Sequence, residues 1–184
     1  MNVVDISVAI AEKVHAGQFR RDGKTPYITH PMRVMRWVET LWEEGEPSND
    51  ALLAAAVLHD TVEDTKGDPN ALIVQIHQQC GSVVSGLVWQ LTKPRLPAYS
   101  RKIYQASLAQ AGSSVRLIKA ADIVDNLDDT DPSVDLEFAV MFADRGEKYA
   151  GIMAVGFLEF VVRKAVDALR GRIDTFLENQ QKEK

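Results

Sequence analysis

The feature that most restricts how this chain can fold is an apolar run followed directly by ionisable residues. Residues 51–58 read Ala-Leu-Leu-Ala-Ala-Ala-Val-Leu. A helix that is apolar on every side is predicted to lie at the centre of a fold, covered by other helices. Ionisable groups at the end of such a helix cost free energy unless something compensates them. Four of them follow here: His59, Asp60, Glu63 and Asp64.

A divalent metal is the simplest compensation for this cluster. On a helix, Glu63 would lie one turn after His59, and Asp64 one turn after Asp60. Three neighbouring carboxylates repel one another unless a cation or a proton offsets their charge. The alternative is a solvated acidic helix end, which is common but would here terminate the most apolar helix of the chain.

Two further residues complete a candidate ligand set. His30 opens a predicted helix, where the alternative is a capping or surface histidine. Asp122 interrupts another mostly apolar helix, with Asn126 on the same face. Two histidines and two aspartates suit Mn²⁺, Fe²⁺ or Zn²⁺ and leave coordination positions for water.

The spacing of apolar residues predicts an all-α fold without strands. No internal repeat and no Gly/Ser-rich linker divides the sequence, so we expect one domain over residues 1–178 and a polar tail at 179–184. The predicted helices cover residues 4–16, 29–44, 51–58, 69–80, 82–92, 98–111, 114–127, 133–145 and 151–178.

Charge and composition limit the classes of partner. With 21 basic and 26 acidic residues, the net charge of −5 argues against a nucleic-acid partner. A local basic cluster of Arg20, Arg21 and Lys24 can still bind a small anion. The apolar stretch at 151–162 is too short and too polar to span a membrane, so no membrane partner is expected. The single cysteine, Cys80, cannot form an internal disulfide, which favours a cytoplasmic setting.

Several stretches, in order, resemble the HD-domain metal-dependent phosphohydrolases. The resemblance is closer to the hydrolase domain of the RelA/SpoT enzymes and to their stand-alone relatives, the small alarmone hydrolases of the Mesh1 type. It is carried by His-Ala-Gly-Gln-Phe-Arg-Arg-Asp-Gly at 15–23, Thr-Pro-Tyr-Ile-Thr-His-Pro at 25–31, residues 54–65, Leu-Thr-Lys at 91–93, and Lys-Ala-Ala-Asp at 119–122 with Asn126.

The resemblance implies a compact multi-helix HD-domain fold and a nucleotide substrate. It implies that Mn²⁺, or another divalent metal, is bound by His30, His59, Asp60 and Asp122, and that Glu63 and Asp64 form the catalytic pair. Arg20 matches a residue near the scissile pyrophosphate, Asn126 one that contacts the nucleotide, and Arg21 and Lys24 are further substrate-binding candidates.

The implied reaction is the hydrolysis of the 3′-pyrophosphate of guanosine tetra- or pentaphosphate, the alarmones of the stringent response, to GDP or GTP and pyrophosphate. Adenosine alarmones of the pppApp type are further candidate substrates.

The chain departs from the family pattern after Asp122, and other functions stay open there. The family continues Arg-Leu-His-Asn-Met, whereas this chain reads Ile-Val-Asp-Asn-Leu at 123–127, followed by Asp128 and Asp129. A phosphohydrolase acting on NADPH, a dNTP or a nucleoside monophosphate is the main alternative. A non-catalytic nucleotide sensor and a purely structural helical domain are the others.

Overall fold

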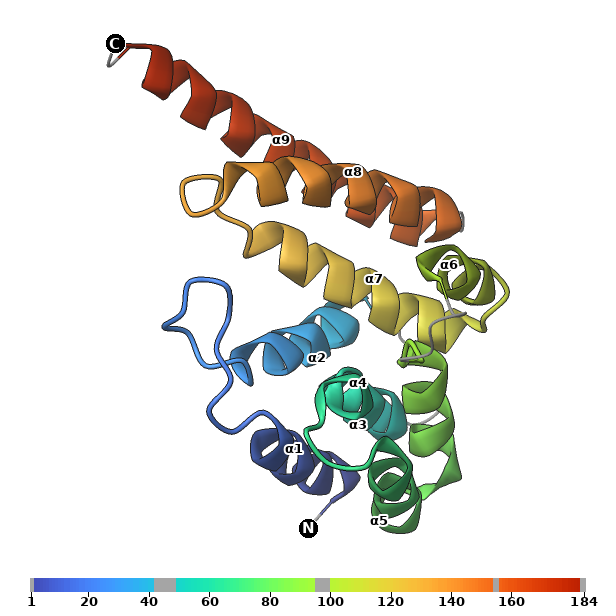
Figure 1. Cartoon of the computed structure of the whole chain (residues 1–184). Helices are drawn as coiled ribbons and strands as arrows, with labels where there is room; N and C mark the ends of the chain where they lie inside the picture. The colour runs from blue at the N-terminus through green and yellow to red at the C-terminus, as the bar shows by residue number, and fades with distance from the viewer. Residues whose placement is uncertain (1, 42–48, 95–99, 154–155, 183–184) are drawn as a thin grey trace. The chain divides into compact units, whose positions relative to one another are not determined.

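Helices make up the regular secondary structure of the residues that the structure, a computed structural model, describes: 2–41, 49–94, 100–153 and 156–182. An isolated bridge between Phe19 and Pro26 adds a single extended pair. Figure 1 shows the helices in chain order: α1 (Val3–Val14), α2 (Thr29–Leu41), α3 (Asn49–Leu58), α4 (Thr61–Asp64), α5 (Pro69–Leu91), α6 (Arg101–Ala109), α7 (Ser113–Asp128), α8 (Leu136–Met153) and α9 (Phe157–Lys182).

The predicted all-α class is therefore confirmed. The predicted ends of two helices, at 42–44 and 98–99, lie outside the described residues.

The chain divides by its internal packing into two compact units, Met1–Ala121 and Asp122–Lys184. The boundary falls inside the helix α7, which runs through it without a break. A single domain over residues 1–178 stays a prediction. The predicted polar tail continues as helix to Lys182, because its Glu, Gln and Lys residues are good helix formers.

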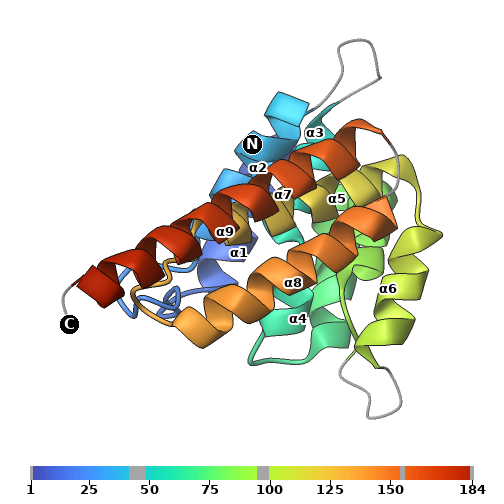
Figure 2. The ribbon, with the colours of Figure 1, turned by 90° about the horizontal axis from the view of Figure 1, so that it is seen from above.

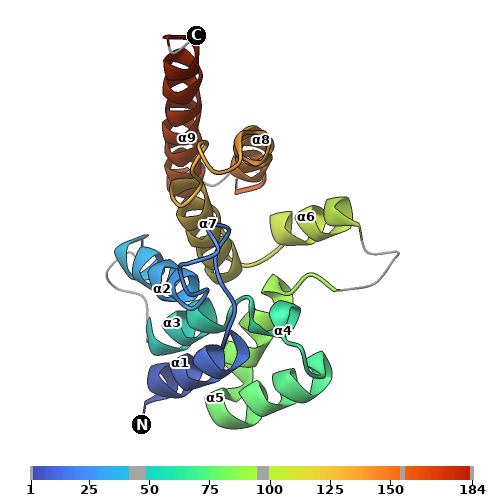
Figure 3. The same ribbon diagram turned by 60° about the vertical axis from the view of Figure 1, so that its left-hand side comes forward.

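The first unit is organised around α3. This helix packs against α1, α2 and α5, and Figure 3 shows it among them. Residues 54–58 are fully buried, each with 0% of its surface exposed. The apolar run thus occupies the centre of the unit, as the sequence predicts.

The sequence predicts that the acidic cluster lies on a helix that continues from the apolar run, but α3 ends before the cluster. It stops at Leu58, His59 and Asp60 form a turn, and α4 begins at Thr61. The hydroxyl of Thr61 donates a hydrogen bond to the carbonyl of Leu58 at 2.7 Å, satisfying a carbonyl that the ended helix leaves over. Asp60 and Asp64 keep the one-turn relation, since the backbone N–H of Asp64 donates to the carbonyl of Asp60 at 2.9 Å.

The helix α5 contains the interruption that the sequence predicts at Gly81. With 23 residues, α5 has the length and hydropathy of a membrane span. However, Gly81 has φ 91° and ψ 170°, a backbone conformation that glycine adopts at no steric cost. Each half of α5 is therefore shorter than the roughly 20 residues that a membrane-spanning helix needs.

The second unit is built on two long helices that lie side by side, α8 and α9 (Figure 2). The buried face of α9 includes Val162, Val166, Leu169 and Ile173. Opposite it, α8 buries mostly small residues: Ala139, Ala143, Gly146 and Ala150. Small side chains on one helix let the larger side chains of the other approach closely.

The predicted helix break between residues 145 and 151 is wrong. The helix α8 continues through Gly146 and Gly151 to Met153, and the positive φ of 51° belongs to Gly156. The reason is a close helix–helix contact, since a Cβ at Gly146 would lie 2.7 Å from Cγ2 of Val166 and 3.1 Å from Cδ1 of Leu127. Gly146 therefore makes room for neighbours distant in sequence and does not end a helix.

We expect Gly146→Ala to lower the free energy of unfolding by about 1–3 kcal/mol, the usual cost of overpacking a tight contact. Gly171→Ala is the matched control, because a Cβ at Gly171 in α9 meets nothing within 4 Å. Replacing this glycine in a helix interior by alanine should raise the free energy of unfolding by about 0.5–1 kcal/mol. Urea denaturation of both variants measures the difference. Equal stabilities of the two variants would contradict the close contact.

Candidate metal centre

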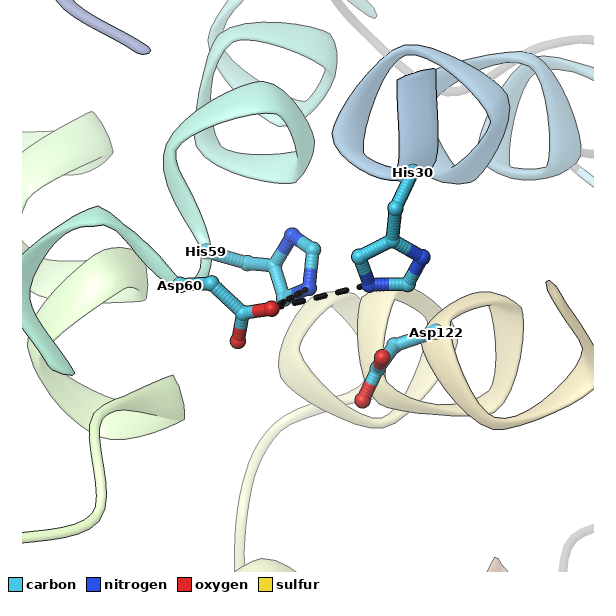
Figure 4. Close-up of side chains that lie close together, drawn as sticks. All are labelled: His30, His59, Asp60 and Asp122. Atoms are coloured by element: carbon cyan, nitrogen blue, oxygen red, sulfur yellow. Dashed lines mark ion pairs between the residues drawn. The ribbon is translucent and has the colours of Figure 1, made fainter. Parts of the chain in front are cut away.

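Four side chains from three segments converge at the end of α3. His30 comes from the first turn of α2, His59 and Asp60 from the turn after α3, and Asp122 from α7. One potential ligand atom from each lies within 4.8 Å of all the others. Figure 4 shows the four side chains close together. These are the four residues that the sequence predicts as metal ligands.

The cluster is largely shielded from solvent. His30, His59 and Asp122 expose 0%, 2% and 5% of their surfaces, while the side chain of Asp60 stays 23% exposed. A buried group of imidazoles and carboxylates with one partly open side is a donor set that can hold a cation and leave positions for water.

The ring of His59 is oriented as in metal-binding histidines. Its Nδ1 lies 2.7 Å from the carbonyl oxygen of Ala56. Because a carbonyl only accepts hydrogen bonds, Nδ1 carries the hydrogen and the neutral ring turns the lone pair of Nε2 toward the cluster. This backbone contact fixes both the tautomer and the angle of the ring.

The distances inside the cluster call for a positive charge. Oδ2 of Asp60 lies 3.1 Å from Nε2 of His59 and 3.5 Å from Nε2 of His30. Electron-rich atoms at such distances repel one another unless a proton or a cation lies between them. The residues present therefore fit a divalent metal, which the chemistry of two imidazoles and two carboxylates accommodates.

The carboxyl group of Asp60 is held in its charged form. Burial alone would raise its pKa, but the neighbouring imidazoles of His59 and His30 outweigh burial and hold the pKa well below its usual value. Asp60 is thus an anionic donor at any physiological pH.

Asp122 is held by Asn126 from the next turn of α7. The side-chain amide of Asn126 donates to Oδ1 of Asp122 at 2.6 Å and to its backbone carbonyl at 2.9 Å. The shared face predicted for these two residues is confirmed. The contact of Asn126 with a nucleotide stays a prediction.

The two acids of the predicted catalytic pair lie in different surroundings. Oε2 of Glu63 accepts a hydrogen bond from the backbone N–H of Lys93 at 3.1 Å, which ties α4 to the segment after α5. Burial, followed by the charges of Asp60 and Glu63, raises the pKa of Asp64 to about 6. A carboxyl group that titrates near neutrality is suited to carrying a proton.

The predicted basic loop is an ordered turn. The backbone N–H of Arg20 donates to the carbonyl of Thr25 at 2.8 Å, and Gly23 takes a positive φ of 69° at the tip. The carboxylate of Asp22 accepts from the backbone N–H groups of Lys24 and Thr25, both at 2.9 Å, and from the Thr25 hydroxyl at 2.6 Å. The turn carries Arg21 and Lys24 at exposed positions.

Arg20, in this loop, lies close to Tyr27, the tyrosine beside the cluster. Its guanidinium carbon lies 5.4 Å from the centre of the Tyr27 ring, and the Tyr27 hydroxyl donates to Oδ2 of Asp60 at 2.7 Å. The loop and the candidate metal centre are thus joined through one side chain.

Sequence reasoning missed two contacts of this site. Tyr27 and Lys93 both stand in the stretches that resemble the hydrolase family, yet neither is predicted as a site residue. The hydroxyl of Tyr27 and the backbone N–H of Lys93 reach acids 33 and 30 residues away. No local spacing pattern signals such contacts.

Comparisons with known proteins agree with this geometry. The HD-domain family profile matches residues 7–134. A Xenopus tropicalis protein named guanosine-3′,5′-bis(diphosphate) 3′-pyrophosphohydrolase MESH1 is 41% identical over 122 residues, 65% of this chain and 64% of that protein. The Drosophila melanogaster protein of the same name is 32% identical over 161 residues, 85% of this chain and 79% of that one.

A solved structure extends the similarity to almost the whole chain. It is described as "A metazoan ortholog of SpoT hydrolyzes ppGpp and plays a role in starvation responses" and is similar with a TM-score of 0.71 at 26% identity. The match covers 94% of this chain and 97% of the other. In sequence, by contrast, the chain aligns with less than two thirds of the frog protein, 64% of its length.

The hydrogen bonds in the basic loop predict an acid-resistant carboxylate at Asp22. The Thr25 hydroxyl, followed by the N–H groups of Lys24 and Thr25, lowers the pKa of Asp22 from 3.8 to about 2. Because the folded pKa is depressed, this contribution to loop order is complete above pH 3.8 and is lost as the pH falls toward about 2.

Thr25→Val should move the midpoint of Asp22 from about 2 toward 3.8, because it removes the first of these donors. Carbon-detected NMR titration of the carboxyl group measures the midpoint. Thr40→Val is the control, since the Thr40 hydroxyl bonds to the Arg36 carbonyl in α2. An unchanged midpoint in Thr25→Val would refute the assigned cause.

Proposed function

The chain belongs to the HD-domain family, and we propose that it is a metal-dependent 3′-pyrophosphohydrolase of guanosine tetra- and pentaphosphate. Water attacks the phosphorus attached to the 3′ oxygen, the bond between them breaks, and GDP or GTP leaves with pyrophosphate. The observation that carries the proposal is the group of two histidines and two aspartates, followed by a pair of acids in the short helix α4. The names of the frog and fly relatives support the same reaction.

The proposed cofactor is Mn²⁺, held by His30, His59, Asp60 and Asp122. When bound, a divalent cation supplies Lewis-acid chemistry, which makes hydroxide available near neutral pH. The two imidazoles and two carboxylates suit several first-row metals, Mn²⁺ among them, so the choice of metal is part of the proposal.

The two acids of α4 receive separate roles. Glu63, held by the N–H of Lys93, orients the attacking water through its carboxylate. Asp64, whose pKa is raised to about 6 chiefly by burial, gives a proton to the departing 3′ oxygen. Such assistance contributes about 10²–10⁴-fold to a rate.

The basic loop supplies the charge that the phosphates need. Arg20 lies against Tyr27 beside the cluster and offsets the charge on the pyrophosphate group that water attacks, since a guanidinium can donate two parallel hydrogen bonds to a phosphate. The exposed Arg21 and Lys24 of the same turn bind the phosphates on the outer side. Asn126, besides holding Asp122, contacts the nucleotide.

A product assay tests the proposed reaction. Purified protein with Mn²⁺ should release pyrophosphate from guanosine tetraphosphate, and EDTA should abolish the release. The adenosine counterpart, NADPH, dNTPs and nucleoside monophosphates are incubated in parallel, so that the assay also ranks the bases. Release of orthophosphate from one of the last three alone would keep the metal centre and overturn the substrate. Metal binding without any turnover would favour a nucleotide sensor.

Substitution of the acid pair tests the roles of Glu63 and Asp64. Glu63→Gln and Asp64→Asn should each lower kcat by about 100-fold or more while the affinity for Mn²⁺, measured by calorimetry, stays close to that of the unsubstituted protein. Glu12→Gln, at an exposed position of α1, is the control and should keep full activity. Full activity of either site variant with metal bound would show that the assigned role is wrong.

A further inference from the structure

Tyr27 touches the candidate metal centre on two sides. Its hydroxyl donates to Oδ2 of Asp60 at 2.7 Å. Its ring meets the ring of His30 edge to face, with centroids 5.7 Å apart and planes at 72°. One side chain thus contacts two of the four candidate ligands, and Figure 4 shows these two residues, His30 and Asp60, pointing toward each other.

The backbone of Tyr27 is fixed on both sides. Its N–H donates to the carbonyl of Gln18 at 2.9 Å, which closes the base of the basic loop. Its carbonyl accepts from the N–H of His30 at 2.9 Å, at the start of α2. Tyr27 and the candidate ligand His30 are therefore positioned by the same turn.

A buried histidine also packs against the Tyr27 ring. His15 is 3% exposed, and its ring lies 4.7 Å from that of Tyr27 with an angle of 32° between the planes. Its Nδ1 lies 2.9 Å from the side-chain oxygen of Gln18, which fixes the ring. Burial lowers the pKa of His15, which favours the neutral form of the ring.

The bond from Tyr27 to Asp60 is not needed to satisfy a buried acceptor. The side chain of Asp60 keeps 23% of its surface exposed to water, and Oδ2 also faces both imidazoles, at 3.1 and 3.5 Å. What the hydroxyl adds is direction. It restrains the rotation of a carboxylate that would otherwise turn toward solvent.

We propose that Tyr27 is a positioning residue of the metal centre, whose hydroxyl holds the Asp60 carboxylate in the orientation that binds the metal, while His15 supports its ring. This inference rests on the proposed function for the presence of a metal, but not for the identity of the nucleotide. Hydrogen bonds of this kind to metal-ligating side chains typically change metal affinity by about 10–100-fold.

The test is Tyr27→Phe, which removes the hydroxyl and keeps the ring against His15 and His30. We expect the affinity for Mn²⁺, measured by isothermal calorimetry on the full chain, to fall by about 10-fold. Under saturating Mn²⁺, the KM for the nucleotide should stay unchanged and kcat should recover in part. His15→Phe, which retains a ring, should have a smaller effect than Tyr27→Phe.

Tyr104→Phe is the matched control. Tyr104 is a buried tyrosine of the first unit, 3% exposed, whose hydroxyl donates to the carbonyl of Leu91 and not to a candidate ligand. Its loss should leave Mn²⁺ affinity unchanged, whatever it does to thermal stability. Unchanged Mn²⁺ affinity in Tyr27→Phe, or equal losses in the two variants, would overturn the proposal.

The calorimetric result separates this inference from the proposed reaction. If the unsubstituted protein binds Mn²⁺ but hydrolyses no alarmone, the substrate proposal fails while the comparison of Tyr27→Phe with Tyr104→Phe still decides the role of Tyr27. If the unsubstituted protein binds no divalent metal, both proposals fail.

Discussion

The burial of α3 is the constraint from which the site follows. Because every face of this helix is apolar, it is stable only when α1, α2 and α5 cover it. Its C-terminal end, which carries His59 and Asp60, is then fixed inside the first unit. Ionisable groups in such a place need compensation, and the nearby imidazoles and carboxylates, with a cation between them, provide it. The packing of the core therefore also determines where the site residues lie.

The same surroundings shift the pKa values of two carboxyl groups, one helical turn apart, in opposite directions. Asp60 faces two imidazoles, which outweigh its burial and keep its pKa well below the usual value. Asp64 is buried and lies near two negative charges, so its pKa rises to about 6. Opposite shifts of neighbouring acids typically assign different tasks to them, which supports the roles proposed for Asp60 in metal binding and for Asp64 in proton transfer.

Local patterns of the sequence predict what depends on short distances along the chain. The all-α class, the central apolar helix, the break at Gly81 and the face shared by Asp122 and Asn126 all follow from helical spacing and turn chemistry. The error at Gly146 has the opposite origin, because the space left by its missing side chain is filled by Val166 and Leu127. The sequence also does not predict the turn at His59 and Asp60, since the residues around it would equally suit a continuing helix. Contacts such as Tyr27 to Asp60 join distant segments and become visible only in the folded chain.

Three of the candidate ligands, His59, Asp60 and Asp122, are each held by a different kind of group. A backbone carbonyl orients His59, a tyrosine hydroxyl orients Asp60, and a side-chain amide orients Asp122. A backbone N–H likewise holds Glu63. Because these contacts come from the protein's own groups, they restrain the donors and reduce the orientational entropy that metal binding would otherwise cost. The hydrophobic packing around α3 offsets the cost of bringing like charges together.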